Sequence, residues 1–132
     1  MKFIFDNNIS SRLVSFLKDI TSGDFPGDHC EHLGERFLRD IKDDDFLRVI
    51  ISERDWVLIT CDNDFKYKTL RTIWKGNAIS IIAFYGDYQG LSGLDKSWKL
   101  LKCWTNIRRA ISKHQDTQFF LVDKKLVVCP KQ

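Results

Sequence analysis

The strongest structural constraint in this chain is a set of apolar runs that are too short for buried helices. Residues Trp56-Val57-Leu58-Ile59-Thr60 form the clearest run, residues 77–84 form a second, and Lys2-Phe3-Ile4-Phe5 opens the chain in a similar way. Strands that read as continuous apolar runs are typical of parallel sheets, because helices cover both faces of such a sheet. The runs therefore predict a mainly parallel central sheet in an α/β fold.

Amphipathic patterns between these runs predict the covering helices. Ser10-Ser11 caps a helix with the apolar positions Leu13, Val14, Phe16, Leu17 and Ile20. Residues 43–54 predict a helix with the apolar face Phe46, Leu47, Ile50 and Ile51. Residues 94–113 predict the longest helix, with the inward positions Leu94, Trp98, Leu101, Trp104, Ile107 and Ile111. A short strand at 28–33 and a closing hairpin of residues 118–122 and 126–129 complete the pattern.

Length and composition limit the class of protein. A chain of 132 residues with 43% hydrophobic and 13% aromatic residues is expected to form one globular domain over residues 1–132. The sequence has no signal-peptide pattern and no apolar stretch long enough for a membrane span, so we expect a cytoplasmic protein that does not enter a membrane. The scattered cysteines Cys30, Cys61, Cys103 and Cys129 lack a CxxC pair, which favours reduced thiols.

Acidic and amide side chains follow the predicted strands. Asp6-Asn7-Asn8 comes directly after the first strand, Asp62 and Asp64 come after Trp56–Thr60, and Asp43-Asp44-Asp45 opens the helix that leads into that strand. The carboxyl ends of parallel strands meet at one edge of a sheet, so these groups can converge there. Carboxylates that lie close together repel one another unless a cation compensates. Aspartate and asparagine oxygens suit Mg²⁺ or Mn²⁺.

Each acidic group also has a purely structural explanation. Asp43–Asp45 favour a helix start through capping and the helix dipole, and Asp62-Asn63-Asp64 is typical of a turn that ends a strand. His29 and His32 are spaced so that they face opposite sides of a strand, which argues against a shared metal. The combination of acidic groups at one predicted edge, rather than any single group, favours a metal site.

Basic residues gather in two stretches although the net charge is only +3. Residues 65–86 carry Lys66, Lys68, Arg71 and Lys75, and residues 96–115 carry Lys96, Lys99, Lys102, Arg108, Arg109 and Lys113, without any acidic residue. One such stretch is explained by a solvated helix face, whereas two favour contact with a polyanion.

These motifs together resemble the PIN-like domains of VapC-type toxins. The resemblance lies in Phe-Asp-Asn-Asn-Ile-Ser after the first strand, Asp-Asp-Asp-Phe-Leu at a helix start and Trp-Val-Leu-Ile-Thr-Cys-Asp-Asn-Asp-Phe. The stretch Gly-Leu-Ser-Gly-Leu-Asp-Lys-Ser-Trp-Lys-Leu-Leu-Lys-Cys-Trp resembles the last helix of one toxin subgroup.

The resemblance implies a metal-dependent ribonuclease on a three-layer α/β/α sandwich, a cognate antitoxin as partner, and the homodimers that such toxins commonly form. It assigns metal binding and catalysis to Asp6, Asp43, Asp62 and Asp64, with Asn7, Asn8, Asp44 and Asp45 as additional ligands or site-lining residues. The cofactor would be Mg²⁺ or Mn²⁺, and metal-activated water would attack an RNA phosphodiester. The RNA backbone would contact Lys66, Lys68 and Arg71, and on the last helix Lys99, Lys102 and Arg109.

Two other functions are consistent with part of the pattern. A response-regulator-like receiver also gathers acids around Mg²⁺, but it predicts a lysine at the end of the last core strand, where this chain has Tyr85-Gly86-Asp87. A PIN-like module that binds RNA or a partner protein without cleaving RNA remains the stronger alternative. Divalent-dependent cleavage separates it from the ribonuclease.

Overall fold

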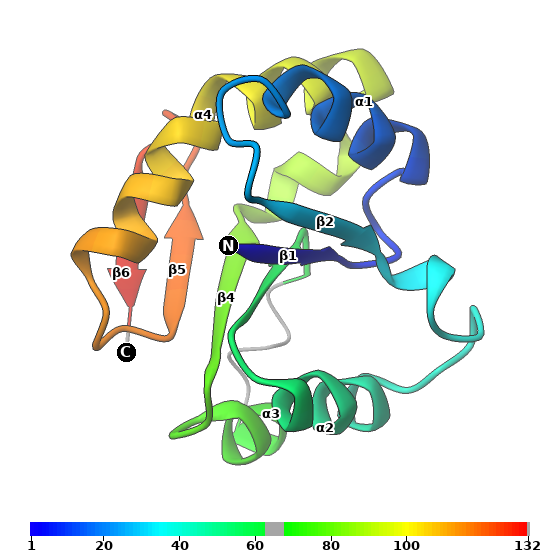
Figure 1. Cartoon of the computed structure of the whole chain (residues 1–132), viewed down its shortest axis with the longest axis vertical. Helices are drawn as coiled ribbons and strands as arrows, with labels where there is room; N and C mark the ends of the chain where they lie inside the picture. Colours follow the sequence, from blue (N-terminus) through cyan, green and yellow to red (C-terminus); the bar gives the residue numbers. More distant parts are fainter. Residues whose placement is uncertain (63–67, 132) are drawn as a thin grey trace.

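A mainly parallel sheet forms the centre of the protein (Figure 1). We describe a computed structural model that covers residues 1–62 and 68–131, including the side chains of all of these except residues 68 and 69. Within these residues the strand order is β2-β1-β3-β4-β5-β6, and only the β5–β6 pair is antiparallel. The strands are β1 (Lys2–Phe5), β2 (His29–His32), β3 (Trp56–Thr60), β4 (Ile79–Phe84), β5 (Phe119–Val122) and β6 (Val128–Lys131).

Helices cover both faces of this sheet. The helices α1 (Ser11–Thr21) and α4 (Gly93–Lys113) lie on one side, and α2 (Asp43–Glu53) and α3 (Lys68–Trp74) lie on the other (Figure 1). Two short 3-10 helices, η1 (Leu33–Glu35) and η3 (Gly86–Gly90), follow β2 and β4. The predicted three-layer α/β/α sandwich is therefore confirmed.

Alternate residues of each central strand enter two separate cores. Phe3 and Phe5 of β1 pack under α4, where their rings lie 4.6 and 5.9 Å from the ring of Trp104. Ile4 of β1 instead packs with Phe46 of α2. All residues of β3 are buried, which is the physical reason why its sequence shows no polar alternation.

The pairing register brings the carboxyl ends of the strands to one edge, which we call the carboxyl edge. Phe5 at the end of β1 pairs with His32 of β2 and with Ile59 of β3, and Thr60 pairs with Ala83 of β4. A helix that connects two parallel strands starts at the carboxyl edge of the first strand and returns to the amino edge of the second. The first turns of α2, α3 and α4 therefore lie toward the same edge as Asp6.

Two predicted helix faces were wrong in part. Phe16 and Ile20 of α1 are 51% and 49% exposed, and Leu94 and Trp98 of α4 are 80% and 44% exposed. The inward stripe of α4 instead comprises Leu100, Cys103, Trp104 and Ile107. Leu94 and Trp98 belong to a neighbouring apolar stripe, displaced around the helix, so they do not reach the sheet.

The closing hairpin exists, but its second strand begins later than predicted. The Asp123 carboxylate accepts hydrogen bonds from the backbone N–H groups of Lys125 (2.8 Å) and Val127 (3.0 Å), and Leu126 adopts a left-handed backbone with φ of 62°. The turn therefore extends through Val127, and the predicted strand at 126–129 becomes β6. In the same way, the strand predicted at 77–84 begins at Ile79.

The remaining expectations concern the cysteines and the membrane. All four cysteines are free, and burial raises the pKa of Cys30 to about 11 and of Cys61 and Cys103 to about 12, so these stay thiols at neutral pH. Across the described ranges, no helix combines the length and the apolar character of a membrane span.

Candidate active site at the carboxyl edge

Asp6 is a buried carboxylate at the junction of β1 and β3. It is 7% exposed, its backbone N–H donates to the carbonyl of Ile59 (2.9 Å), and its Oδ1 accepts from the N–H of Asn7 (2.7 Å). Burial raises the pKa of Asp6, against the opposing effects of its hydrogen bonds from Thr60 and Asn7. No lysine or arginine of the described ranges forms an ion pair with it. A bound cation would therefore favour the ionised form of Asp6.

Thr60 holds Asp6 in place from the neighbouring strand. Its fully buried hydroxyl donates to Asp6 Oδ2 (2.8 Å) and accepts from the backbone N–H of Asp62 (2.9 Å) and from Asn8 Nδ2 (3.4 Å). Asn8 Oδ1 in turn accepts from the N–H of Cys61 (3.1 Å). This network fixes the segments that leave β1 and β3 relative to each other, and it uses Asn8 as a structural bridge.

His32 holds the loop after Asp6 against the end of β2. Its Nδ1 accepts from the N–H of Gly34 (3.0 Å), so the ring proton lies on Nε2, which donates to the carbonyl of Ile9 (2.7 Å). A Cβ on Gly34 would lie 3.1 Å from His32 Nδ1, so a larger residue there would displace the ring by a few tenths of an ångström. His29 is exposed and pairs with Glu31 (3.0 Å), so the two histidines face apart, as predicted.

Asn7 points away from the core, toward the loop before α2. Its Nδ2 donates to the carbonyl of Arg39 (3.4 Å), and it lines an open hollow of about 810 Å³ that also includes Glu35, Arg39 and the first turns of α1. We call this the Asn7 hollow. This open hollow therefore begins at the residue that follows Asp6.

The three consecutive acids of α2 differ in orientation. Asp43 and Asp44 are half-buried and Asp45 is exposed. Asp43 lies one helical turn before the buried residues Phe46 and Leu47, so it continues the stripe that faces the sheet. Of the three acids, Asp43 is therefore the one on the inward face at the carboxyl edge.

The other predicted acids lie after β3. Asp62 is half-buried, and its backbone is fixed by Thr60, whereas Asp64 lies outside the described residues. Within the described part of the chain, no group of three or more His, Cys, Asp or Glu side chains is close enough to hold a metal ion. The donors are of the right type for Mg²⁺ or Mn²⁺, and the unneutralised Asp6 carboxylate favours a cation, but the described acids alone are too few.

The predicted basic residues are spread along the molecule. Lys66 and the side chain of Lys68 lie outside the described part, and Arg71 lies on α3. Lys99 donates to the hydroxyl of Tyr85 (3.1 Å), just after β4, and Lys102 lies 5.2 Å from the ring of Trp98. Arg109 bonds Asn106 far along α4, near the amino edge of the sheet.

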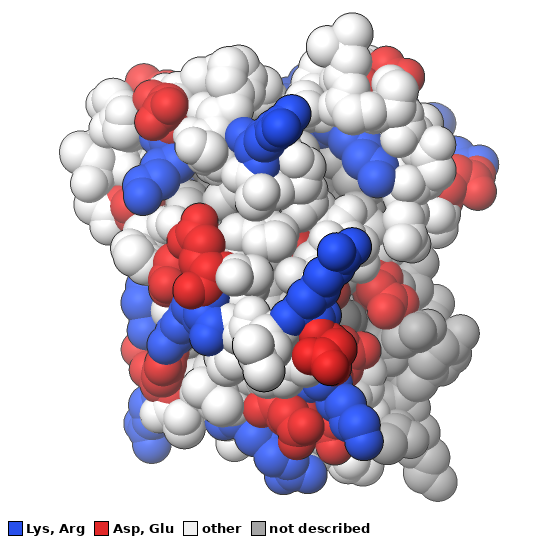
Figure 2. Space-filling view, turned by 90° about the vertical axis from the view of Figure 1, so that its right-hand side faces the viewer, with Lys and Arg blue, Asp and Glu red and all other residues white. Residues whose placement is uncertain are grey.

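The carboxyl ends of β1 and β2 point to the right in Figure 1, and Figure 2 views the molecule from that side. Acidic and basic side chains are intermixed there. The described residues of the visible face therefore form no single basic patch.

Comparison with known families identifies the fold. A family model described as "PIN like domain" matches residues 1–83. The chain belongs to the PIN-like domain family. No curated protein and no solved structure matches the chain. The match includes Asp6, Asp43, Asp62 and Asp64 and ends before α4, and PIN-like domains are commonly nucleases.

Sequence reasoning missed two residues of this PIN-like domain that build the site. In the sequence, Thr60 is only the last residue of a predicted apolar strand, and His32 is only a histidine whose spacing argues against metal binding. Their roles depend on the pairing of β1 with β2 and β3, which brings residues 23 to 54 positions apart into contact. A buried polar residue at the end of an otherwise apolar strand is the signal that indicates such a role.

Proposed function

We propose that this PIN-like domain is a divalent-metal-dependent ribonuclease that cleaves RNA phosphodiester bonds in the cytoplasm, as the VapC-like toxin of a toxin–antitoxin pair. The observation that carries the proposal is Asp6: a buried carboxylate with a raised pKa and no paired cation in the described ranges, held by Thr60 where β1 and β3 end. A buried carboxylate with a perturbed pKa, next in the chain to a residue that lines an open hollow, is typical of a functional site.

Asp6, Asp43 and Asp62, with Asp64, are the residues that would hold Mg²⁺ or Mn²⁺. The bound ion would supply a water of lowered pKa and positive charge for the phosphate in the transition state. Each oxygen of Asp6 accepts one hydrogen bond, which leaves lone pairs for a cation. Thr60 and Asn7 orient this carboxylate, and Asn8 and His32 keep the surrounding loops in place.

RNA cleavage by the purified protein tests the proposal. A mixed cellular RNA pool is incubated with Mg²⁺ or Mn²⁺, and in parallel with EDTA. We expect divalent-dependent cleavage that Asp6→Asn abolishes, while Asp19→Asn on the exposed face of α1 cleaves like the native protein. Cleavage that persists in EDTA or in Asp6→Asn would contradict the assignment.

The toxin role makes a separate prediction about growth. Production of the native protein in bacteria is expected to stop growth, and Asp6→Asn at an equal protein level is expected to permit it. Co-production of the cognate antitoxin would restore growth. Arrest by both forms would argue against a toxin that acts through cleavage.

A second function is supported by the small number of gathered acids. Because the described residues contain no group of three metal-ligating side chains, a PIN-like module that binds RNA or a partner protein without cleaving RNA is the alternative. It predicts RNA binding that needs no divalent metal, and no cleavage at any metal concentration by a folded, antitoxin-free protein.

A further inference from the structure

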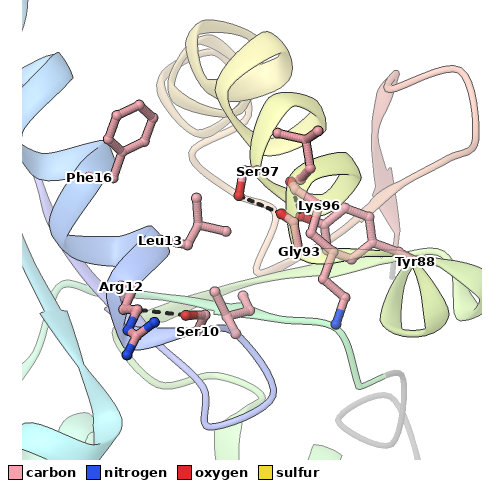
Figure 3. A pocket seen from close by; sticks show the side chains of 10 residues that line it. Ser10, Arg12, Leu13, Phe16, Tyr88, Gly93, Lys96 and Ser97 are labelled. Atoms are coloured by element: carbon pink, nitrogen blue, oxygen red, sulfur yellow. Dashed lines mark hydrogen bonds between the residues drawn. The ribbon is translucent and has the colours of Figure 1, made fainter.

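Two hollows meet around the start of α1. The Asn7 hollow lies on one side, and a hollow of about 420 Å³ lies between α1 and α4 on the other (Figure 3). We call the second the inter-helix hollow. Ile9, Ser10 and Arg12 line both, so the two hollows adjoin at the start of α1, beside Asn7, which follows Asp6 in the chain; we call the two hollows together the groove.

Three basic side chains are spaced along this groove. Arg39 lines the Asn7 hollow, Lys96 lines the inter-helix hollow, and Arg12 lines both. Lys96 lies in the first turn of α4, which is at the carboxyl edge of the sheet. The groove therefore carries three cationic side chains, and Glu35 of the Asn7 hollow is the one acidic side chain among its described lining residues.

These three side chains are free of ion pairs with the described residues, unlike other basic residues of the chain. Arg36 binds Glu53 (2.6 Å), Arg108 binds Asp28 (2.8 Å), and Lys124 pairs with Asp87 (2.9 Å). Arg12 and Arg39 are exposed. Guanidinium and ammonium groups without an internal partner are available to bind phosphates.

The inter-helix hollow also has an apolar wall. Leu13, Phe16, Tyr88 and Leu94 line it, and Phe16 and Leu94 are 51% and 80% exposed. Figure 3 shows Phe16 and Leu13 on α1 opposite Tyr88 and Lys96 across this space. An apolar wall beside a row of cations suits a single strand, whose unpaired bases pack on side chains while its phosphates meet the cations.

We propose that this groove binds a single-stranded segment of the RNA substrate, with phosphates on Arg39, Arg12 and Lys96 and bases against Phe16 and Leu94. The proposal rests on the ribonuclease function above and identifies the face of the molecule from which the strand reaches Asp6. It gives no role to Arg109, which lies thirteen residues beyond Lys96 on α4, about 20 Å away along the helix axis.

Salt-dependent binding tests the phosphate contacts. The anisotropy of a labelled, mixed-sequence single-stranded RNA is measured in EDTA, so that no cleavage is required. Each phosphate contact contributes about 0.7 to the slope of log K against log salt concentration for single strands. The triple variant Arg12→Gln, Arg39→Gln, Lys96→Gln is therefore expected to bind more weakly and to lower the slope by about 2. The matched triple variant Lys18→Gln, Arg48→Gln, Lys113→Gln changes net charge equally and is expected to keep the native slope.

The apolar wall is tested independently. Phe16→Ser with Leu94→Ser is expected to weaken RNA binding without changing the salt slope, whereas the control Ile20→Ser, at an exposed site of α1 outside the groove, keeps native affinity. Thermal melts followed by circular dichroism test whether each variant is folded. The conservative variant Lys96→Arg keeps the positive charge and is expected to retain the native salt slope.

Equal slopes for the two triple variants, or a native protein that does not bind single-stranded RNA, would overturn the proposal. The proposal would also be overturned if the double variant Phe16→Ser, Leu94→Ser binds RNA normally and loses only a protein partner. Because binding is measured without metal, these results are distinguishable from failure of the ribonuclease, which appears as absent cleavage with intact binding.

Discussion

Replacing Thr60 by valine removes one hydroxyl and the three hydrogen bonds that this hydroxyl makes. The hydroxyl donates to Asp6 Oδ2 (2.8 Å) and accepts from Asp62 N–H (2.9 Å) and Asn8 Nδ2 (3.4 Å), and Thr60 has no exposed surface. A hydrogen bond to a charged group contributes about 1.5–3 kcal/mol, and an unsatisfied buried N–H costs about 1–3 kcal/mol. We expect Thr60→Val to lower the free energy of unfolding by about 3 kcal/mol at neutral pH.

The expected loss depends on pH, because part of it comes from the ionised form of Asp6. When Asp6 is protonated, the bond from Thr60 is no longer charge-assisted, so the deficit should shrink to about 1–2 kcal/mol in acid. Urea denaturation at pH 7 and at acidic pH measures both values. Thr60→Ser keeps the hydroxyl and should lose about 1 kcal/mol from the missing methyl group, equally at both pH values. Thr105→Val on the exposed side of α4 should change stability by less than about 0.5 kcal/mol.

A Thr60→Val protein as stable as the native one at neutral pH would refute this reasoning. A deficit that stays constant as Asp6 becomes protonated would also refute it, since the loss would then come from packing rather than from the carboxylate. The same variant should cleave RNA more slowly, because Asp6 loses the donor that orients it.

Three further predictions follow from the structure. Arg54 adopts φ 61° and ψ 157°, a backbone conformation that costs a non-glycine residue about 1–3 kcal/mol. Arg54→Gly should therefore raise the urea concentration at the midpoint of unfolding, whereas Arg48→Gly inside α2 should lower it. The hydrogen bonds from Arg36 lower the pKa of Glu53 to about 2. This pair therefore stabilises the folded state above pH 4.5, and the stabilisation is lost as the pH falls toward 2. The stability deficit of Arg36→Met should accordingly disappear as the pH is lowered from 4.5 to 2. Because the pKa of Asp6 is raised, protons compete with the cation for this carboxylate. The Mg²⁺ affinity measured by calorimetry should therefore increase with pH, with a midpoint above pH 3.8. A midpoint at or below pH 3.8 would contradict a buried ligand.

The pH dependence of the metal-free protein follows from the same carboxylate. A raised folded-state pKa means that the folded state binds a proton more tightly than the unfolded state does, so the stability from Asp6 is present at low pH and decreases as pH rises through that pKa. Bound Mg²⁺ should restore stability at neutral pH. A stabilising effect of Mg²⁺ on the native protein that is equally large in Asp6→Asn would show that the ion binds elsewhere.

The layers of the fold were predictable because buried parallel strands have a distinctive sequence. The runs that became β1, β3 and β4 are apolar at nearly every position, since each packs against helices on both faces. The position of Asp6 was predictable for the same reason, because a polar residue that follows such a run must lie at the carboxyl edge. The apolar pattern of the strands and the geometry of a parallel sheet were together sufficient to predict the layers and the position of Asp6.

The helix faces were less predictable because two apolar stripes run along the same helix. In α4, Leu94 and Trp98 continue a stripe through Leu101, while Leu100 and Cys103 form the stripe that packs on the sheet. Helical periodicity alone does not show which of the two stripes faces the sheet, because that depends on how the helix is placed over the sheet. Of this second stripe, Leu94 lines the inter-helix hollow.

The supporting residues of the site could not be predicted from local sequence. Thr60 and Asp6 are 54 positions apart, and His32 and Ile9 are 23 positions apart, so each contact exists only through the strand register. The groove cations Arg12 and Arg39 carry no sequence motif. They become candidates only because the structure places them along connected hollows beside Asn7.

The most direct test of the central claim is the single-turnover rate of RNA cleavage at saturating Mg²⁺ for native protein, Asp6→Asn and Asp19→Asn. We expect Asp6→Asn, which keeps the size of the side chain and removes its charge, to cleave at the rate measured in EDTA, and Asp19→Asn to cleave at the native rate. A folded Asp6→Asn protein that cleaves RNA at the native rate would contradict the claim that the carboxyl edge of this sheet is the active site.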